Sequence, residues 1–210
     1  MKKGKESRKK QTQHGKGAVR YSVLPEQGGA FQLQVDFRFA RPPETYYYAD
    51  ALSISLDQEM GVAILAFGRT SSEGGLRDRL DVIMPQVSLL GAFLSSIAQV
   101  ESSVDKQLEL LKLRPVSRMV ASAAPSRGTL YANLIFMSTG GAESCLDFYY
   151  MPVRDIHFAK TVGSEISLQP VIRIPTSPVL LKHMFNLCRE FSGGLKSRDS
   201  RRSPDRAKVS

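Results

Sequence analysis

Hydrophobic and polar residues alternate along several short stretches of the chain, and such alternation predicts half-buried β-strands. The clearest stretch is 32–39, where Leu, Val and Phe alternate with Gln, Asp and Arg. The same reasoning predicts further strands over 46–56, 62–69, 80–84, 129–138, 144–151 and 166–174. Apolar residues recur at helical spacing in two other segments, which predicts helices over 86–113 and 178–191.

The stretch from 171 to 191 shows how one such unit is built. Its first four residues are rich in β-branched side chains, and Pro175 is expected to end the strand. Ser177 is suited to cap the helix, and Pro178 takes the first helical position, where a missing amide proton costs nothing. Gly193 and Gly194 are expected to stop the helix. The unit is a strand, a tight turn and an amphipathic helix.

The same pattern occurs earlier in the chain. Residues 81–90 align with 171–180, and the segment Tyr48-Ala49-Asp50 aligns with Tyr131-Ala132-Asn133. In addition, 65–67 aligns with 146–148. Three matches in the same order indicate an internal duplication, and the alternative is chance similarity among common residues.

The predicted fold class is therefore α+β, with two tandem β-β-β-α units related by a pseudo-twofold axis. Six to eight antiparallel strands would form one sheet or two abutting sheets, and both helices would lie on the same side. The predicted organisation is a disordered basic tail over 1–20, a first unit with an extra N-terminal strand over 21–114, a linker over 115–128, a second unit over 129–194 and a disordered basic tail over 195–210. The part of the first helix beyond Glu101 has no counterpart, so it would pack on another chain or bridge the two halves.

The positive charge is concentrated at the ends of the chain. The net charge is +9, of which residues 1–20 contribute +7 and residues 195–210 contribute +4, so residues 21–194 sum to −2. A basic folded face is therefore not expected, although the tails could bind a polyanion. The apolar runs are too short to span a membrane, and the basic N-terminus lacks the apolar segment of a secretory signal, so a soluble cytoplasmic protein is expected.

The second half resembles a small bacterial domain family of uncharacterised function. That family pairs a Tyr-x-Asn strand with an Arg-Ile-x-x-Ser-Pro helix start, usually in a single copy. The matching residues are Tyr131, Asn133, Asp147, Phe148, Arg173, Ile174, Ser177 and Pro178. The first half departs from the pattern, with Asp50, Ile83 and Ser88 in place of Asn, Arg and Pro. The resemblance implies a fold and a bacterial source but no activity. A looser similarity is to the export chaperone SecB, which also sets helices against one antiparallel sheet.

Residue patterns typical of catalysis or metal binding do not stand out. The three histidines do not have metal-ligand spacing, and a phosphate-binding loop motif and a nucleophile elbow are both missing from the sequence. Cys145 and Cys188 are expected to be buried, reduced thiols. The acidic pairs Asp78/Asp81 and Glu143/Asp147 are interpreted as solvated. The expectation is a protein that is not an enzyme and needs neither a cofactor nor a metal.

The predicted function is a non-enzymatic protein-binding or assembly module, in one form a chaperone-like holdase. The predicted protein interface is an exposed apolar strip on the first helix, formed by Val104, Leu108 and Leu111. It would serve a protein partner or self-association.

The alternative is a nucleic-acid-binding protein that uses basic tails and tyrosine-rich strands. The tail residues proposed for this role are Lys2, Lys3, Lys5, Arg8, Lys9, Lys10, Arg198, Arg201 and Arg202. The alternative reading of the aromatic residues is that some fill the core while the others cover the outer face.

Overall fold

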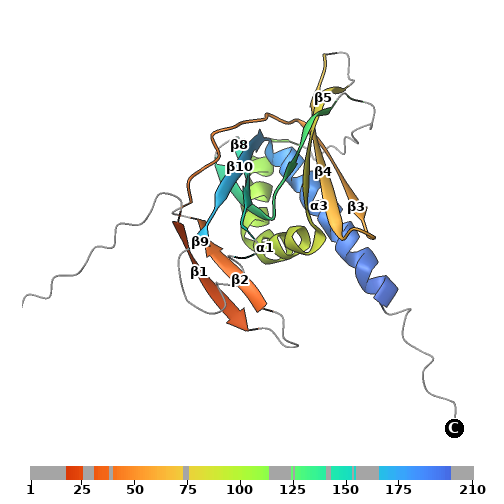
Figure 1. Ribbon diagram of the computed structural model, residues 1–210. Helices are drawn as coiled ribbons and strands as arrows, with labels where there is room; N and C mark the ends of the chain where they lie inside the picture. The colour runs from red at the N-terminus through yellow and green to blue at the C-terminus, as the bar shows by residue number, and fades with distance from the viewer. Residues whose placement is uncertain are drawn as a thin grey trace, which may run out of the picture. The chain divides into compact units, whose positions relative to one another are not determined.

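A computed structural model describes residues 18–25, 31–37, 40–72, 76–113, 124, 126–140, 143–152, 154 and 166–199. Within these ranges, the side chains of 18–25, 31–34, 93–99, 166 and 193–199 are not described. The chain divides into two compact units, one from residues 1–41 and 153–168 and the other from 42–152 and 169–210 (Figure 1).

The smaller unit contains one antiparallel sheet. Its strands are β1 (Ala18–Pro25), β2 (Phe31–Asp36) and β9 (Ile166–Ser167), in the order β2-β1-β9. The strand predicted over 32–39 is β2, which ends at Asp36. The start of β1 at Ala18 corrects the predicted tail boundary at residue 20, because Val19, Tyr21 and Val23 already alternate with polar residues there.

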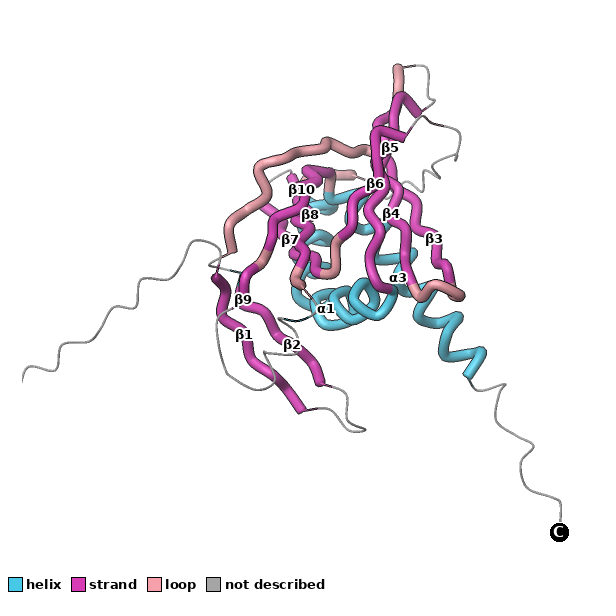
Figure 2. The backbone as a smooth tube through the Cα atoms, viewed as in Figure 1, coloured by secondary structure: helices cyan, strands magenta, loops and turns pink. Residues whose placement is uncertain are grey.

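The larger unit has α+β architecture, as predicted. Its four-stranded sheet contains β3 (Ala51–Asp57), β4 (Val62–Thr70), β5 (Leu76–Pro85) and β6 (Ser126–Tyr131), in the order β3-β4-β5-β6. Its three-stranded sheet contains β7 (Leu134–Gly140), β8 (Glu143–Tyr150) and β10 (Gln169–Thr176), in the order β10-β8-β7. The long helices are α1 (Gln86–Leu110) and α3 (Pro178–Asp199). Figure 2 shows these helices beside the two sheets.

Two features of the predicted sheet are wrong. The described residues form ten strands in three sheets, where six to eight strands in one sheet or two abutting sheets were expected. In addition, β6 pairs with β5 in parallel, so the sheets are not purely antiparallel. The parallel pairing arises because the strand predicted over 129–138 breaks near its middle, and its first piece joins β5. The third sheet arises from β1, which was not predicted, and from β9, the first piece of the strand predicted over 166–174. The strand predicted over 46–56 also breaks near its middle, and its two pieces join different sheets.

The first break lies between Ala49 and Asp50. Tyr46 forms a parallel bridge with Arg173 of β10, and the Ala49 amide donates to the Pro175 carbonyl at 3.2 Å. The next amide, that of Asp50, donates instead to Gly68 of β4 at 3.1 Å. The chain therefore leaves the three-stranded sheet and enters the four-stranded sheet at this point.

The second break, between Ala132 and Asn133, runs in the opposite direction. Tyr131 pairs with Ile83 of β5, and the Ala132 amide donates to the Ile83 carbonyl at 3.0 Å. The Asn133 amide then donates to Tyr149 of β8 at 3.0 Å. Here the chain leaves the four-stranded sheet and enters the three-stranded sheet.

A polar side chain fixes each crossing point. Asp50 accepts hydrogen bonds from the amide and the hydroxyl of Thr70, at 2.8 and 2.7 Å. Asn133 accepts from the Met151 amide at 2.8 Å and donates to the Met151 carbonyl at 2.7 Å. Each side chain thus satisfies backbone groups of a residue that is distant in sequence, which suits a point where the strand changes partners.

Several predicted turns and caps are confirmed. Asp57 accepts from the amides of Glu59 and Met60, and Gly61 has φ of 65°, so the predicted turn joins β3 to β4. The Ser177 hydroxyl accepts from the Leu180 amide at 3.2 Å and caps α3.

Two predicted ends are wrong. β10 continues through Pro175 to Thr176, because the Pro175 carbonyl still accepts the Ala49 amide. α3 continues through Gly193 and Gly194 to Asp199, so 195–199 belongs to the helix and not to a disordered tail. Likewise, β6 begins at Ser126, inside the predicted linker.

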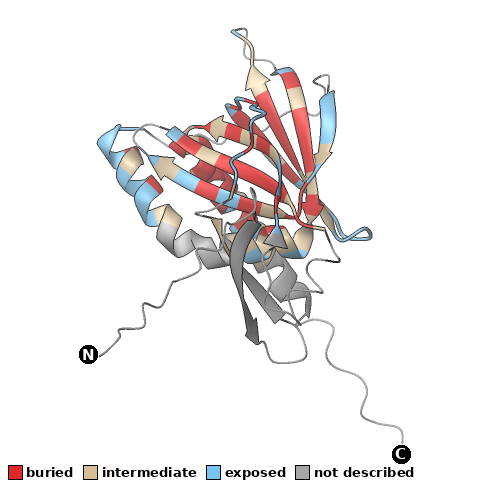
Figure 3. Ribbon diagram, turned by 60° about the vertical axis from the view of Figure 1, so that its left-hand side comes forward, coloured by how far each residue is buried: buried red, intermediate tan, exposed pale blue. Residues whose placement is uncertain are grey.

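The core of the larger unit is one apolar cluster that includes side chains from both sheets and both helices. Leu89 of α1 and Leu181 of α3 are fully buried in it. At its centre the rings of Phe67 and Phe148 meet edge to face, with centroids 5.7 Å apart. Figure 3 shows buried residues following the strands of both sheets. This core holds the two sheets together and fixes the faces that point away from it.

Candidate functional site

The most distinctive surface is on the three-stranded sheet, on the face that points away from the core. The register places Tyr46, Arg173, Asp147 and Phe136 side by side on four neighbouring chain segments. We call these four residues the aromatic row. Tyr46 is 62% exposed and Phe136 is 38% exposed. With strands about 4.8 Å apart, the row spans about 14 Å.

An ion pair occupies the centre of the aromatic row. Nε and Nη2 of Arg173 donate to the two carboxylate oxygens of Asp147, each at 2.6 Å. Asp147 is only 3% exposed. A bidentate pair of this kind holds the guanidinium plane in one orientation, so the middle of the row is rigid. Burial, together with the nearby Asp147 carboxylate, raises the pKa of Tyr149 to about 12, so this neighbouring hydroxyl stays neutral at physiological pH.

The four-stranded sheet carries no such row at the corresponding place. There the register aligns Ser53, Ala66, Asp81 and Thr129. Asp81 pairs with Arg79 at 2.9 Å. The surface differs from the aromatic row because small and polar residues take the places of the aromatic ones.

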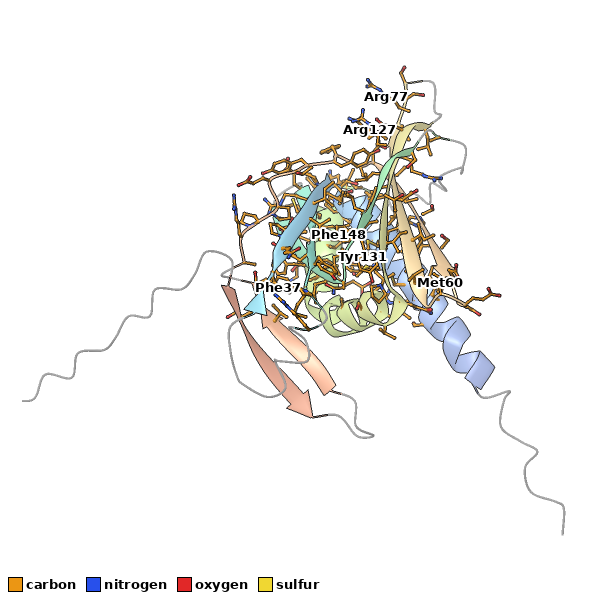
Figure 4. All side chains as sticks on the ribbon, viewed as in Figure 1. Phe37, Met60, Arg77, Arg127, Tyr131 and Phe148 are labelled. Atoms are coloured by element: carbon orange, nitrogen blue, oxygen red, sulfur yellow. The ribbon has the colours of Figure 1, made fainter. Side chains whose placement is uncertain are left out.

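A second polar cluster surrounds Asp78. Its carboxylate accepts from the Tyr47 hydroxyl at 2.8 Å, from Arg69 Nε at 2.9 Å and from Arg127 Nε at 2.6 Å, and it also accepts from Arg69 Nη2. The Arg69 guanidinium lies over the Tyr47 ring, 5.3 Å from its centroid. Figure 4 places Arg127 near Arg77, at the N-terminal end of β5.

These contacts make Asp78 a cross-link between the sheets. Hydrogen bonds from Arg69 and Tyr47, aided by the charge of Arg127, hold the pKa of Asp78 well below its usual range despite its burial. Tyr47 belongs to the segment that pairs with β10, whereas Asp78 lies on β5. The prediction that Asp78, Asp81 and Asp147 are solvated is wrong, because all three are buried in ion pairs; Glu143 is exposed, as expected.

The aromatic residues divide between core and surface, which favours the interpretation that some fill the core and others cover the outside. Tyr46 and Tyr48 are more than half exposed, while Tyr47 between them is buried. Tyr131 is 50% exposed, and its ring meets that of Tyr150 edge to face at 5.9 Å.

The predicted interface on α1 is wrong. Val104 and Leu108 are buried in the core, and Leu111 is 37% exposed. The outer half of α1 packs on α3 instead, where Lys182 pairs with Glu101 and Asp105 at 2.7 Å each. The outer half of α1 was expected either to pack on another chain or to bridge the two halves, and it bridges the two halves.

The basic tail residues predicted to bind nucleic acid lie outside the described residues. This holds for all six at the N-terminus and for Arg201 and Arg202. Arg198 belongs to the backbone of α3, but its side chain is not described. Their role therefore stays a prediction.

Other reactive groups are dispersed. Within the described ranges no three His, Cys, Asp or Glu side chains come close enough to hold a metal ion. Both cysteines are free thiols; Cys188 is buried as predicted, whereas Cys145 is only partly buried, so the prediction is wrong for Cys145. Burial raises the pKa of Cys188 to about 12 and also raises that of Cys145, so both thiols are protonated at neutral pH.

None of the described helices is long and apolar enough to cross a membrane.

Comparison with protein-family models, with curated proteins and with solved structures finds no match for this chain. The resemblance to the small bacterial domain family stays a prediction. The candidate site therefore depends on geometry alone. Sequence reasoning noted the tyrosines and quoted Arg173 and Asp147, but it missed the aromatic row, since the row depends on strand register.

Proposed function

We propose that this protein is a non-enzymatic protein-binding module of the cytoplasm, and that the outer face of the three-stranded sheet is its binding surface. The observation that carries the proposal is the aromatic row, with exposed rings at both ends of a fixed Arg173–Asp147 pair. Tyr and Arg are enriched among the residues that dominate binding energies at protein interfaces. A rigid surface also loses little conformational entropy on binding.

The buried charges support a binding role over a catalytic one. Asp78, Asp147 and Glu101 each pair with at least one arginine or lysine, and each pair links separate strands or helices. Charges committed to such cross-links are poorly placed to exchange protons with a substrate. A chaperone-like holdase that binds exposed apolar segments is one form of the proposed function.

We also propose that the chain arose by tandem duplication and has a pseudo-twofold axis. The hydrogen bonds at the two crossings support this: Ala49 to Pro175 corresponds to Ala132 to Ile83, and Asp50 to Gly68 corresponds to Asn133 to Tyr149. These bonds align Ile83 with Pro175. The sequence alignment of 81–90 with 171–180 has an offset of ninety, so the two alignments differ by two positions.

The same correspondence extends to other elements. It aligns Gln86 with Pro178, which are the first residues of α1 and α3, and Thr70 with Met151, which fix the two crossing points. It also aligns Phe67 with Phe148, and these rings touch each other. Residues near a twofold axis are expected to contact their own counterparts. On this proposal one half kept the aromatic row and the other did not, so each chain has one binding surface.

Removing the two exposed rings tests the proposed function. The double variant Tyr46→Ser with Phe136→Ser should capture partner proteins at least about tenfold less well, because it deletes the aromatic anchors of the interface. The matched control changes the corresponding positions of the other sheet, Ser53→Ala with Thr129→Ser. Partners would be captured from cell extract on each immobilised full-length variant and quantified by mass spectrometry. Equal capture by all three proteins would contradict the proposal.

A nucleic-acid-binding role is the second candidate, and the exposure of Tyr46, Tyr48 and Tyr131 favours it. Exposed aromatic rings can stack on bases, while the basic tails would contact phosphates. Replacing Lys2, Lys3, Lys5, Arg8, Lys9 and Lys10 with Gln should weaken binding of single-stranded RNA and flatten its salt dependence. Fluorescence anisotropy of labelled poly(U) at two salt concentrations would measure this. Undetectable binding by the unmodified chain would exclude this candidate.

A further inference from the structure

Two arginines share the Asp78 carboxylate near the N-terminal end of β5. Arg69 of β4 binds both of its oxygens, through Nε at 2.9 Å and also through Nη2. Arg127 of β6 adds a second ion pair, with its Nε 2.6 Å from Oδ2 of Asp78. The carboxylate carries one negative charge, and each guanidinium group carries one positive charge because arginine stays protonated in proteins. These three residues therefore have a surplus of one positive charge.

Arg127 brings charge and donors that the ion pair between Arg69 and Asp78 does not use. Arg69 alone already neutralises Asp78, which also accepts from the Tyr47 hydroxyl at 2.8 Å. The side chain of Arg127 is 54% exposed, and Asp78 is its sole partner within the part of the chain that the structure describes. A guanidinium group has five N–H donors, so Arg127 keeps donors for a further acceptor.

The backbone of β6 fixes the position of Arg127. A β-bulge places two residues of β6, Arg127 and Gly128, opposite the single residue Leu80 of β5. Gly128 has φ of 147°, a conformation that residues with side chains rarely adopt. Arg69 is fixed as well, because its guanidinium lies over the Tyr47 ring and is held by a bidentate ion pair. An anion that binds both arginines would therefore lose little conformational entropy in ordering them.

Positive charge is concentrated in the sequence around this cluster. Segment 111–128, which includes Arg127, contains four basic residues and no acidic residue. Segment 69–81, which includes Arg69 and Asp78, contains three residues of each sign. The two segments together contribute +4, although residues 21–194 sum to −2. An anion is thus attracted to this end of the four-stranded sheet and not to the folded region as a whole.

The described carboxylates of the same sheet region leave this surplus in place. Asp81 pairs with Arg79 at 2.9 Å, and Asp50 accepts from the amide and the hydroxyl of Thr70. A further arginine, Arg77, is exposed and lies near Arg127 (Figure 4).

We propose that Arg69 and Arg127 form a binding site for a phosphate group, either inorganic phosphate or the phosphate of a small ester. A phosphate group has several oxygens that accept charge-assisted hydrogen bonds, so it can contact two guanidinium groups from different strands at once. A carboxylate has only two oxygens and matches one guanidinium fork, the role that Asp78 already fills for Arg69. This inference is independent of the proposed function, since the aromatic row lies on the other sheet.

The variant Arg127→Gln tests the inference, because it removes the surplus charge and leaves Asp78 paired with Arg69. Arg127→Lys is a milder variant that keeps the charge but loses the guanidinium fork. Lys106→Gln is the matched control, since it removes one positive charge from an exposed position on α1. Isothermal titration calorimetry of the full-length chain with inorganic phosphate, glycerol 3-phosphate and acetate, at constant ionic strength, would measure the dissociation constants. Circular dichroism would check that each variant is folded.

At least one of the two phosphate compounds should bind the unmodified chain saturably and about tenfold more tightly than acetate. Arg127→Gln should weaken this binding at least about tenfold, Arg127→Lys should weaken it by a smaller factor, and Lys106→Gln should leave it unchanged. Tighter binding of glycerol 3-phosphate would identify an ester as the ligand, whereas equal or tighter binding of inorganic phosphate would identify the free anion.

The inference would be overturned if neither phosphate compound bound saturably, or if acetate bound as tightly as they do. Binding that neither Arg127 variant weakens would also contradict it, as would an equal loss in Lys106→Gln, because the basic tails or the overall charge would then account for the binding. Tyr46→Ser with Phe136→Ser should bind phosphate like the unmodified chain, which separates this site from the proposed protein-binding surface.

Discussion

Replacing Phe148 by alanine should lower the free energy of unfolding by about 3–5 kcal/mol, the usual cost of truncating a fully buried phenylalanine. Phe148 is fully buried, and its ring meets that of Phe67 edge to face with centroids 5.7 Å apart. The two rings come from different sheets, on β8 and β4. Truncation would therefore leave a cavity where the two sheets meet, and packed neighbours relax only partly into such a cavity.

Urea unfolding followed by circular dichroism would measure this effect. Phe67→Ala should cost a similar amount, and the double variant should cost less than the two single costs added together, by about 0.5–1.5 kcal/mol for the lost ring contact. Phe136→Ala is the matched control, because Phe136 is partly exposed on the same sheet as Phe148. A loss below about 1 kcal/mol for Phe148→Ala would show that the sheets do not share one core.

Local signals in the sequence were sufficient to predict much of this fold. The helix start at Ser177 and the turn from Asp57 to Gly61 depend on residues within a few positions of each other, and both are confirmed. The α+β class followed from strand and helix periods that are equally local. Such features survive in the structure because capping and turn residues satisfy nearby backbone groups wherever the element is placed.

The crossings could not be predicted in the same way. Alternation continues through Ala49 and Asp50, so the sequence pattern indicates one long strand. The structure breaks it because the two sides of this point pair with β10 and β4, which lie far apart in sequence. Choosing a strand partner is a non-local decision, and the alternating pattern contains no information about it. The Asp50 and Asn133 side chains were the available signals, since both bond to backbone at the crossing.

The candidate site could not be predicted from the sequence for a related reason. Tyr46, Arg173, Asp147 and Phe136 are separated by up to 127 positions, and only the register brings them into one row. The acidic residues were predicted to be solvated because carboxylates usually are. Asp147 and Asp78 can be buried because each pairs with arginines on other strands, and the sequence does not identify these arginines as their partners. For the same reason, the helical stripe containing Val104 indicated an apolar face but not which neighbour covers it.

Replacing Asp78 by asparagine should lower the free energy of unfolding by about 2–4 kcal/mol at pH 7, because it leaves two arginines without their shared counterion. Asp78 is buried and accepts from Tyr47, Arg69 and Arg127. The arginines are partly exposed, so water would compensate part of the loss. Tyr47→Phe is the matched control. It removes one hydrogen bond but leaves both ion pairs, so it should cost only about 1 kcal/mol.

The sharper test is the pH dependence of the stability that Asp78→Asn loses relative to the unmodified chain. Folding lowers the pKa of Asp78, so its stabilising contribution is present above the pKa of an unfolded aspartate, about 3.9, and is lost as the pH falls through the lower pKa of the folded state. Urea unfolding at pH 7, 5 and 3 should therefore show a constant gap between the unmodified chain and Asp78→Asn at the two higher values and a smaller gap at pH 3. The small cost of Tyr47→Phe should change less, because a tyrosine hydroxyl is neutral throughout this range. If the gap for Asp78→Asn were equally large at pH 3, the loss would come from altered packing around position 78, and the ion pairs would not be what joins the two sheets.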